Sequence, residues 1–146
     1  MTAAFVLDAS VTAAWLLPDE HTPAARRAYA RLRAAVVEAH APELWLWECG
    51  NLIANAVRRR RMSADDALLT WSVLDAVRTR VELALYEPAQ ARACLVLGLD
   101  HGLSIFDASY LWLALSRRLP LLTHDDALAA AARAAGATPL RLEDLA

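Results

Sequence analysis

The sequence predicts an α/β domain in which helices cover both faces of a mainly parallel sheet. Short apolar segments bounded by turn residues alternate along the chain with longer helical stretches. Strands that alternate with helices pair in parallel, because the helices form the crossover connections. The length of 146 residues suits one domain with a sizeable core. Since no repeat or linker divides the chain, we expect a single domain over residues 1–146.

The first half of the chain is expected to begin with a short buried strand. In order, its elements are a strand (4–7), two helices (10–17 and 22–37), an extended piece near Ala41 and a helix (42–61). Pro18 ends the first helix, since proline cannot continue one. Pro42 is suited to the first turn of the last helix.

The second half repeats this alternation. Its elements are a helix that begins at Ser63, a strand (81–86), helices (88–99 and 104–119), a strand (120–123), a helix (124–136) and a last short strand (138–142). Ser63 is a good N-cap with acids in the following turn. Gly136 is typical of a helix end. The helix after Ser104 is apolar nearly all round, so we expect it to be buried.

Composition excludes several classes of function. All 15 basic residues are arginine, so the chain lacks the lysine that a Walker-type phosphate loop or a Schiff base requires. The net charge of −2 gives no global basic field, and a polyanion would need a local basic patch or bound cations. Cys49 and Cys94 have no metal or redox spacing, which favours a reducing, cytoplasmic compartment. No segment predicts a signal peptide or membrane helix.

Two acids follow buried strands directly. Asp8 comes after the strand 4–7, and Asp125 comes two residues after Thr123, at the end of the strand 120–123. Ligands of open parallel sheets bind outside the carboxyl ends of the strands. The alternative for Asp8 is a helix cap or an Asx-turn. Asp126 is the weaker candidate, because a first-turn position beside the helix dipole explains it.

Two further acids lie on predicted helices. Glu48 shares a narrow polar stripe with Asn51, Asn55 and Arg58. That stripe points either into a cleft or simply into solvent. Asp107 begins the apolar helix, where it is either an N-cap or a buried acid beside the others.

All four acids can converge at one edge of a parallel sheet. Clustered carboxylates repel one another and raise one another's pKa, and a divalent cation resolves the conflict. An oxygen-only ligand set favours Mg²⁺, with Mn²⁺ able to substitute. Such an ion activates water and favours phosphate oxygens, which predicts phosphodiester hydrolysis. Ser10 and Thr123 either orient water or phosphate there or serve as ordinary turn residues.

Four motifs in order resemble the PIN-domain ribonucleases, above all the VapC-type toxins of toxin–antitoxin pairs. They are "VLDASV" near the start, E-x-x-N from Glu48 to Asn51, "FDASYLWLA" at 106–114 and "LLTHD" at 121–125. The resemblance covers nearly the whole chain and implies a three-layer α/β/α fold. It implies that Asp8, Glu48, Asp107 and Asp125 bind Mg²⁺ or Mn²⁺ for RNA cleavage, with Ser10, Asn51 and Thr123 as supporting polar residues.

The resemblance also implies a homodimer and a small antitoxin protein that inserts a segment near the active site. Arg58 and Arg59 follow the helix of Glu48 and are candidates for contact with RNA or with antitoxin acids. The alternative is a solvated helix end.

Other functions remain open at this point. A phospho-receiver domain also gathers acids and binds Mg²⁺, but it needs a late lysine, which this chain lacks. A PIN-like module that only binds RNA or a partner would not need the four acids. A nuclease that acts on DNA would share the same chemistry.

Overall fold

The structure is a computed structural model that describes residues 3–145 and contains one five-stranded, all-parallel sheet. The strands lie in the order β3-β2-β1-β4-β5. Their bounds are β1 (Ala3–Leu7), β2 (Val37–Pro42), β3 (Val81–Ala84), β4 (Leu121–Leu122) and β5 (Pro139–Leu140). The predicted α/β class with a parallel central sheet is confirmed.

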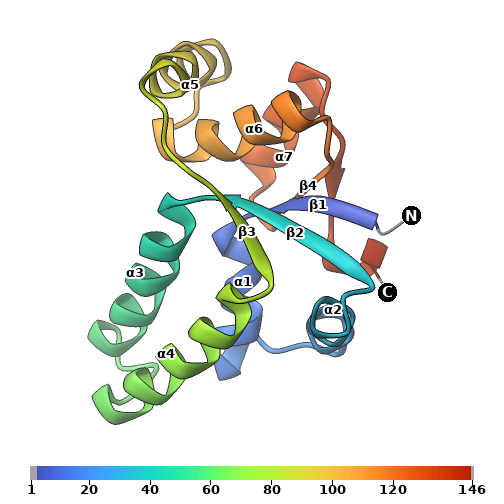
Figure 1. Ribbon diagram of the computed structural model, residues 1–146. Coiled ribbons are helices and arrows are strands. Elements are labelled where there is room, and N and C mark those ends of the chain that lie inside the picture. Colours follow the sequence, from blue (N-terminus) through green and yellow to red (C-terminus); the bar gives the residue numbers. More distant parts are fainter. Residues whose placement is uncertain (1–2, 146) are drawn as a thin grey trace.

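Helices form the two outer layers (Figure 1). Their bounds are α1 (Ala9–Leu16), α2 (Pro23–Arg33), α3 (Leu44–Arg58), α4 (Ala64–Arg78), α5 (Pro88–His101), α6 (Ile105–Arg117) and α7 (Asp126–Ala135), with short 3-10 turns η1 (Pro18–Glu20) and η2 (Leu142–Leu145). The helices α1 to α4 lie on one side of the sheet, and α6 and α7 lie on the other, with α5 packed on α6. This is the three-layer α/β/α arrangement.

The chain starts in the middle of the sheet. From β1 it moves outward through β2 to β3, and then crosses back to add β4 and β5 on the other side of β1. The strand order therefore reverses between β1 and β4, and ligands of doubly wound sheets bind at the carboxyl ends of such a strand pair. Asp8 follows β1 and Thr123 follows β4, so both lie at this point.

The core lies between the sheet and both helical layers. Phe5 to Leu7 are fully buried on β1, and Trp45 and Tyr110 are the largest fully buried side chains of the flanking helices. The Trp45 indole nitrogen donates to Thr12 Oγ1 at 3.0 Å, which satisfies its buried polar atom. Cys49 and Cys94 are buried free cysteines, as expected from the sequence.

The helix expected over residues 22–37 is too long, and the extended piece after it is too short. The helix α2 ends at Arg33, because Ala35 adopts a left-handed backbone with φ of 55°. From Val37 onward the chain is a full strand whose burial alternates residue by residue. The sequence of Val37–Pro42 alternates in the same way, with the period of a half-buried strand, and this pattern could have predicted the strand.

The next helix also starts later than expected. Pro42 is the last residue of β2 and pairs with Ala84, and α3 begins at Leu44. The other expected elements are present, with ends that shift by a few residues. Within residues 3–145 the structure has no helix long and apolar enough to cross a membrane.

Candidate active site

Asp8 occupies the first position before α1 but does not cap that helix. Its backbone is extended, and its side chain makes no capping hydrogen bond. Instead, Asp8 Oδ2 accepts hydrogen bonds from Ser10 Oγ at 2.6 Å and from Thr123 Oγ1 at 2.7 Å. Asp8 is only 4% exposed. The cap alternative therefore does not account for Asp8.

The two hydroxyl groups connect the ends of β1 and β4. Ser10 Oγ accepts from the backbone N–H of His124 at 3.0 Å, and Thr123 Oγ1 accepts from the backbone N–H of Asp125 at 3.0 Å. Each hydroxyl thus accepts one hydrogen bond from the backbone and donates one to Asp8. This network fixes the orientation of the Asp8 carboxylate and leaves its Oδ1 without a side-chain donor.

Asp125 and Asp126 have different surroundings. Asp125 caps α7, because its Oδ1 accepts from the backbone N–H of Leu128 at 2.9 Å, while its other oxygen stays available. Asp126 forms an ion pair with Arg141, whose guanidinium also donates to the Thr123 carbonyl at 3.1 Å. Arg141 therefore neutralises Asp126 next to the site, which favours Asp125 as the ligand.

Asp107 lies in the first turn of α6 without capping it. The N-cap is Ser104, whose Oγ accepts from the backbone N–H of Asp107 at 3.1 Å. The Asp107 carboxylate is half-buried, and it interacts electrostatically with Asp8 and Asp125, while the Ser104 hydroxyl beside it opposes the resulting rise in its pKa.

Glu48 projects from α3 into the space beside α6. Its Oε1 is buried without a hydrogen-bond partner, and the Tyr110 hydroxyl is buried in the same condition. The two groups influence each other's ionisation but do not reach hydrogen-bond geometry. A buried carboxylate oxygen without a donor is costly, which indicates a ligand position. Asn51 is exposed one turn later and makes no side-chain hydrogen bond among the described residues.

The pKa values of three acids are raised. Burial, and next the charge of Asp8, raise the pKa of Glu48 to about 7. Burial raises the pKa of Asp8, the hydroxyls of Ser10 and Thr123 oppose that rise, and Asp125 adds to it. Burial followed by the charges of Asp8 and Asp125 raises the pKa of Asp107. Each of these three acids is thus close enough to another acid for its charged form to be disfavoured.

The ligand chemistry fits a hard divalent cation. Within residues 3–145 no three acidic, histidine or cysteine side chains already stand at the spacing of metal ligands. A closed cluster is not required, because Mg²⁺ keeps several waters and is usually bound through only one or two carboxylates. The partnerless Glu48 oxygen and Asp8 Oδ1, which has no side-chain donor, offer such positions.

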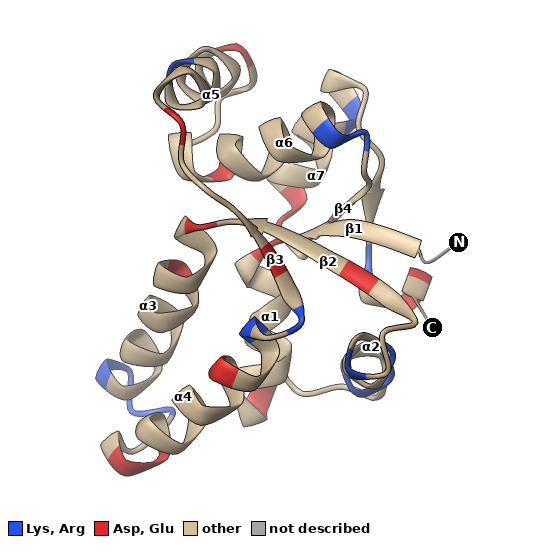
Figure 2. Cartoon of the chain, in the orientation of Figure 1, with Lys and Arg blue, Asp and Glu red and all other residues tan. Residues whose placement is uncertain are grey.

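Figure 2 shows acidic segments in the first half of α3 and at the starts of α6 and α7, at the same end of the sheet. The basic segment at the end of α3 lies away from them. There Arg58 donates to Asn55, and Arg59 is exposed. Arg61 is bound to the carboxylates of Asp19 and Glu20.

Sequence reasoning missed Arg141 and Tyr110. Arg141 is a single arginine in a short terminal segment, and no local pattern indicates that it reaches Asp126. Tyr110 lies three residues after Asp107 on the buried helix, where an aromatic residue is expected in the core. Its neighbouring acid on α3 is 62 positions away in the sequence, so only the fold reveals the pair.

Comparisons relate the chain to a family of known proteins. The sequence profile of the family described as "PIN domain" matches residues 5–134. A protein named Ribonuclease VapC3, from Pyrobaculum aerophilum, is 31% identical over 128 residues, which are 85% of this chain and 91% of that protein. The crystal structure of PAE2754, also from Pyrobaculum aerophilum, superimposes with a TM-score of 0.75 at 22% identity and covers 99% of this chain and 93% of that one.

Proposed function

The chain belongs to the PIN-domain family, and from this premise we propose that it is a Mg²⁺- or Mn²⁺-dependent endoribonuclease that acts as a VapC-type toxin. The observation that carries the proposal is the group of acids at the β1–β4 switch point. Burial and neighbouring acids raise the pKa values of Asp8, Glu48 and Asp107, so the protein holds negative charge where it destabilises the metal-free fold. A bound divalent cation turns that repulsion into binding energy.

We assign Asp8, Glu48, Asp107 and Asp125 as the residues that hold the ion. Ser10 and Thr123 orient Asp8 through their hydroxyl groups. When bound, the ion supplies an activated water and charge stabilisation for phosphodiester hydrolysis. In this assignment the acids hold the ion beside the scissile phosphate, and Arg58 and Arg59 hold the RNA backbone.

The proposal includes the biological setting of VapC-type toxins. A small antitoxin protein would neutralise this chain, and the chain would act as a homodimer in the cytoplasm. Support for these parts comes from the relative named Ribonuclease VapC3 and from the resemblance of the motifs. Toxicity on expression, relieved by co-expression of a neighbouring small gene product, is the expected result. Light scattering of the purified protein should give the mass of two chains.

Cleavage of single-stranded RNA tests the catalytic assignment. The wild type should cut RNA with Mg²⁺ or Mn²⁺ and lose activity with chelator, and Asp8→Asn and Asp107→Asn should each abolish cleavage. Asp75→Asn, which changes an exposed acid of α4, is the matched control and should cut at the wild-type rate. Wild-type rates in both Asp8→Asn and Asp107→Asn, with folding verified by circular dichroism, would reject the site.

The same assay separates the two alternatives. Single-stranded DNA of the same sequence should resist cleavage, and equal cleavage of DNA would identify a nuclease without preference for RNA. Binding of RNA with no cleavage under any divalent ion would identify a binding module instead. The four acids argue against that module, since they oppose RNA binding when no cation is present.

A further inference from the structure

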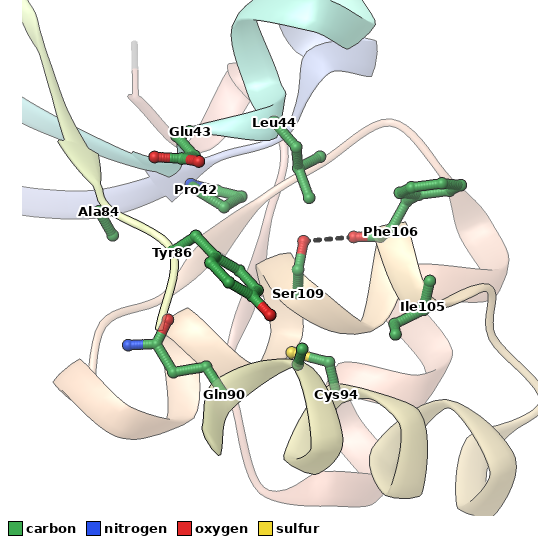
Figure 3. Close-up of a pocket in the computed structure, with 11 residues that line it drawn as sticks. Pro42, Glu43, Leu44, Ala84, Tyr86, Gln90, Cys94, Ile105, Phe106 and Ser109 are labelled. Carbon is green, nitrogen blue, oxygen red and sulfur yellow. Dashed lines mark hydrogen bonds between the residues drawn. The ribbon is translucent and has the colours of Figure 1, made fainter. Parts of the chain in front are cut away.

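An apolar pocket lies at the ends of the two helices that carry Glu48 and Asp107, although none of the four candidate acids lines it. It has a volume of about 210 Å³ and lies between the starts of α3 and α6, the chain after β3, and α5. Figure 3 shows Tyr86 on one side of it and Phe106 and Ile105 on the other, with Ser109 between them. Cys94 lines it as well.

Both helices that supply candidate acids also supply walls of this pocket. Leu44 lines the pocket one turn before Glu48 on α3, and residues four apart share a helix face. Phe106 lines it from the position directly before Asp107 on α6. The pocket is therefore within about one helical turn of Glu48 and Asp107, which is near enough for one RNA strand to reach both.

The side chains of the pocket suit a flat aromatic ligand with polar edges. Tyr86 and Phe106 are 61% and 58% exposed, so their rings are available for stacking. Glu43 makes no capping hydrogen bond to α3, which leaves its carboxylate free to accept from a ligand. The Gln90 amide also lines the pocket and adds donors and an acceptor.

We propose that this pocket binds one unpaired base of the RNA substrate, which stacks on the Phe106 ring and contacts Tyr86 on the opposite side of the pocket. The inference rests on the proposed function and adds a subsite for the base to it. Sequence-specific RNA recognition targets unpaired bases that stack on aromatic side chains and form hydrogen bonds along their edges. The volume is below the range of about 300 to 1,000 Å³ that drug-sized ligands occupy, which suits a single ring system.

Two substitutions at Phe106 separate stacking from simple apolar contact. Phe106→Leu keeps an apolar side chain but removes the aromatic face, and Phe106→Trp keeps that face. Phe106→Leu should raise KM for a cleaved oligoribonucleotide about 5- to 100-fold with little change in kcat, as expected for the loss of base stacking. Phe106→Trp should stay within about threefold of the wild type. Leu99→Ala is the control, since Leu99 is 76% exposed on α5 outside the pocket.

An abasic nucleotide, moved through the oligoribonucleotide one position at a time, identifies the bound base. In the wild type one position should raise KM, and in Phe106→Leu the same abasic change should have no further effect. Tyr86→Leu should behave in the same way. If no position shows this loss of sensitivity, the pocket does not hold a base.

Binding of a fluorescent oligoribonucleotide to the Asp8→Asn protein distinguishes failure of the subsite from failure of the proposed function. Cleavage that is unaffected by Phe106→Leu overturns the subsite alone. If Phe106→Leu weakens RNA binding but the wild type does not cleave RNA, the base subsite stands and the proposed nuclease activity is wrong. Unchanged RNA binding with loss of dimer mass or of antitoxin binding would assign the pocket to a protein partner and overturn the proposal.

Discussion

Asp8 is held by two hydroxyl donors and is almost fully buried, yet its pKa is raised because burial outweighs those donors. A residue kept for stability alone would have a cationic partner or would be neutral. Glu48 has even less support, since one of its oxygens is buried without a donor. These acids therefore reduce the stability of the metal-free protein, as expected where function requires charge.

The pH dependence of stability should reveal this cost. The pKa of Glu48 is raised from 4.5 to about 7, so its contribution is fully present below pH 4.5 and is lost as pH rises through 7. Asp8 and Asp107 are raised as well and act in the same direction. Thermal unfolding of the metal-free protein should accordingly show a midpoint that falls between pH 4.5 and 7. Glu48→Gln should flatten that fall, and added Mg²⁺ should oppose it.

Asp19→Asn is the control for this pH profile. Arg61 lowers the pKa of Asp19, so the contribution of Asp19 is present above its usual pKa of 3.8 and stays constant across the window. Its removal should shift the whole curve without changing its slope. A slope that is the same in Glu48→Gln and in the wild type would contradict the assignment of the titrating group.

The adjacent acids Asp125 and Asp126 should differ in their effect on cleavage. Asp125→Asn should abolish cleavage but keep the fold, because asparagine caps a helix about as well as aspartate. Asp126→Asn should retain cleavage, because its carboxylate is already paired with Arg141. Rates at saturating Mg²⁺ and melting curves of both variants test this. Loss of cleavage in Asp126→Asn at wild-type stability would show that Asp126 belongs to the site.

For single residues, the sequence predicts where a site residue lies relative to the strands and helices, but not which side chains it contacts. Asp8 and Asp125 could be placed because each follows a buried strand. That Ser10 and Thr123 donate to the same oxygen of Asp8 depends on how β1 and β4 pair across 115 positions of sequence. The pocket of Tyr86 and Phe106 was not predicted, because its walls come from five elements, β2, α3, β3, α5 and α6.

Helix ends decide which oxygens are free at the site. Ser104 and Ser63 cap α6 and α4 in the same way, each accepting from the backbone N–H three residues later. Of these two helices, only α6 carries a candidate ligand, since its first turn holds Asp107. The two serines form a matched pair in which capping is constant and proximity to the site differs.

Ser104→Ala and Ser63→Ala should each lower the free energy of unfolding by about 1 kcal/mol, the usual value of an N-cap. Ser104→Ala should also lower kcat, because the first turn of α6 frays where Asp107 must be fixed. Ser63→Ala should leave kcat unchanged. Chemical denaturation and steady-state kinetics measure both quantities. If Ser104→Ala and Ser63→Ala have the same kcat, the cap of α6 does not contribute to cleavage.

Element boundaries show what local patterns leave undetermined. The expected helix over residues 22–37 joined a real helix to the first residue of β2, because alanines and valines suit both periods there. The left-handed turn at Ala35 separates the two elements. Glycine is the residue that usually adopts this backbone conformation, so an alanine gives no sign of the turn in the sequence. By contrast, the N-cap at Ser63 was predictable from its own sequence, because the signal is local.

The whole molecule separates its charges. Acids collect at the switch point of the sheet, and four consecutive arginines, residues 58–61, lie at the turn between α3 and α4 (Figure 2). With a net charge of −2, the protein has no long-range attraction for RNA, so binding depends on this local basic segment and on the bound cation. Within that segment Arg61 is occupied by Asp19 and Glu20, whereas Arg59 is not paired within residues 3–145.

Arg59 and Arg61 should therefore differ in the salt dependence of RNA binding. Arg59→Gln should weaken binding for all sequences alike and reduce the slope of log affinity against log salt by about 0.7, the value for one phosphate contact of a single strand. Arg61→Gln should leave the slope unchanged, because its charge is already neutralised by two carboxylates. Fluorescence anisotropy with the non-cleaving Asp8→Asn protein, at a series of salt concentrations, measures both. If Arg61→Gln lowers the slope and Arg59→Gln does not, the RNA backbone runs along η1 instead of the end of α3.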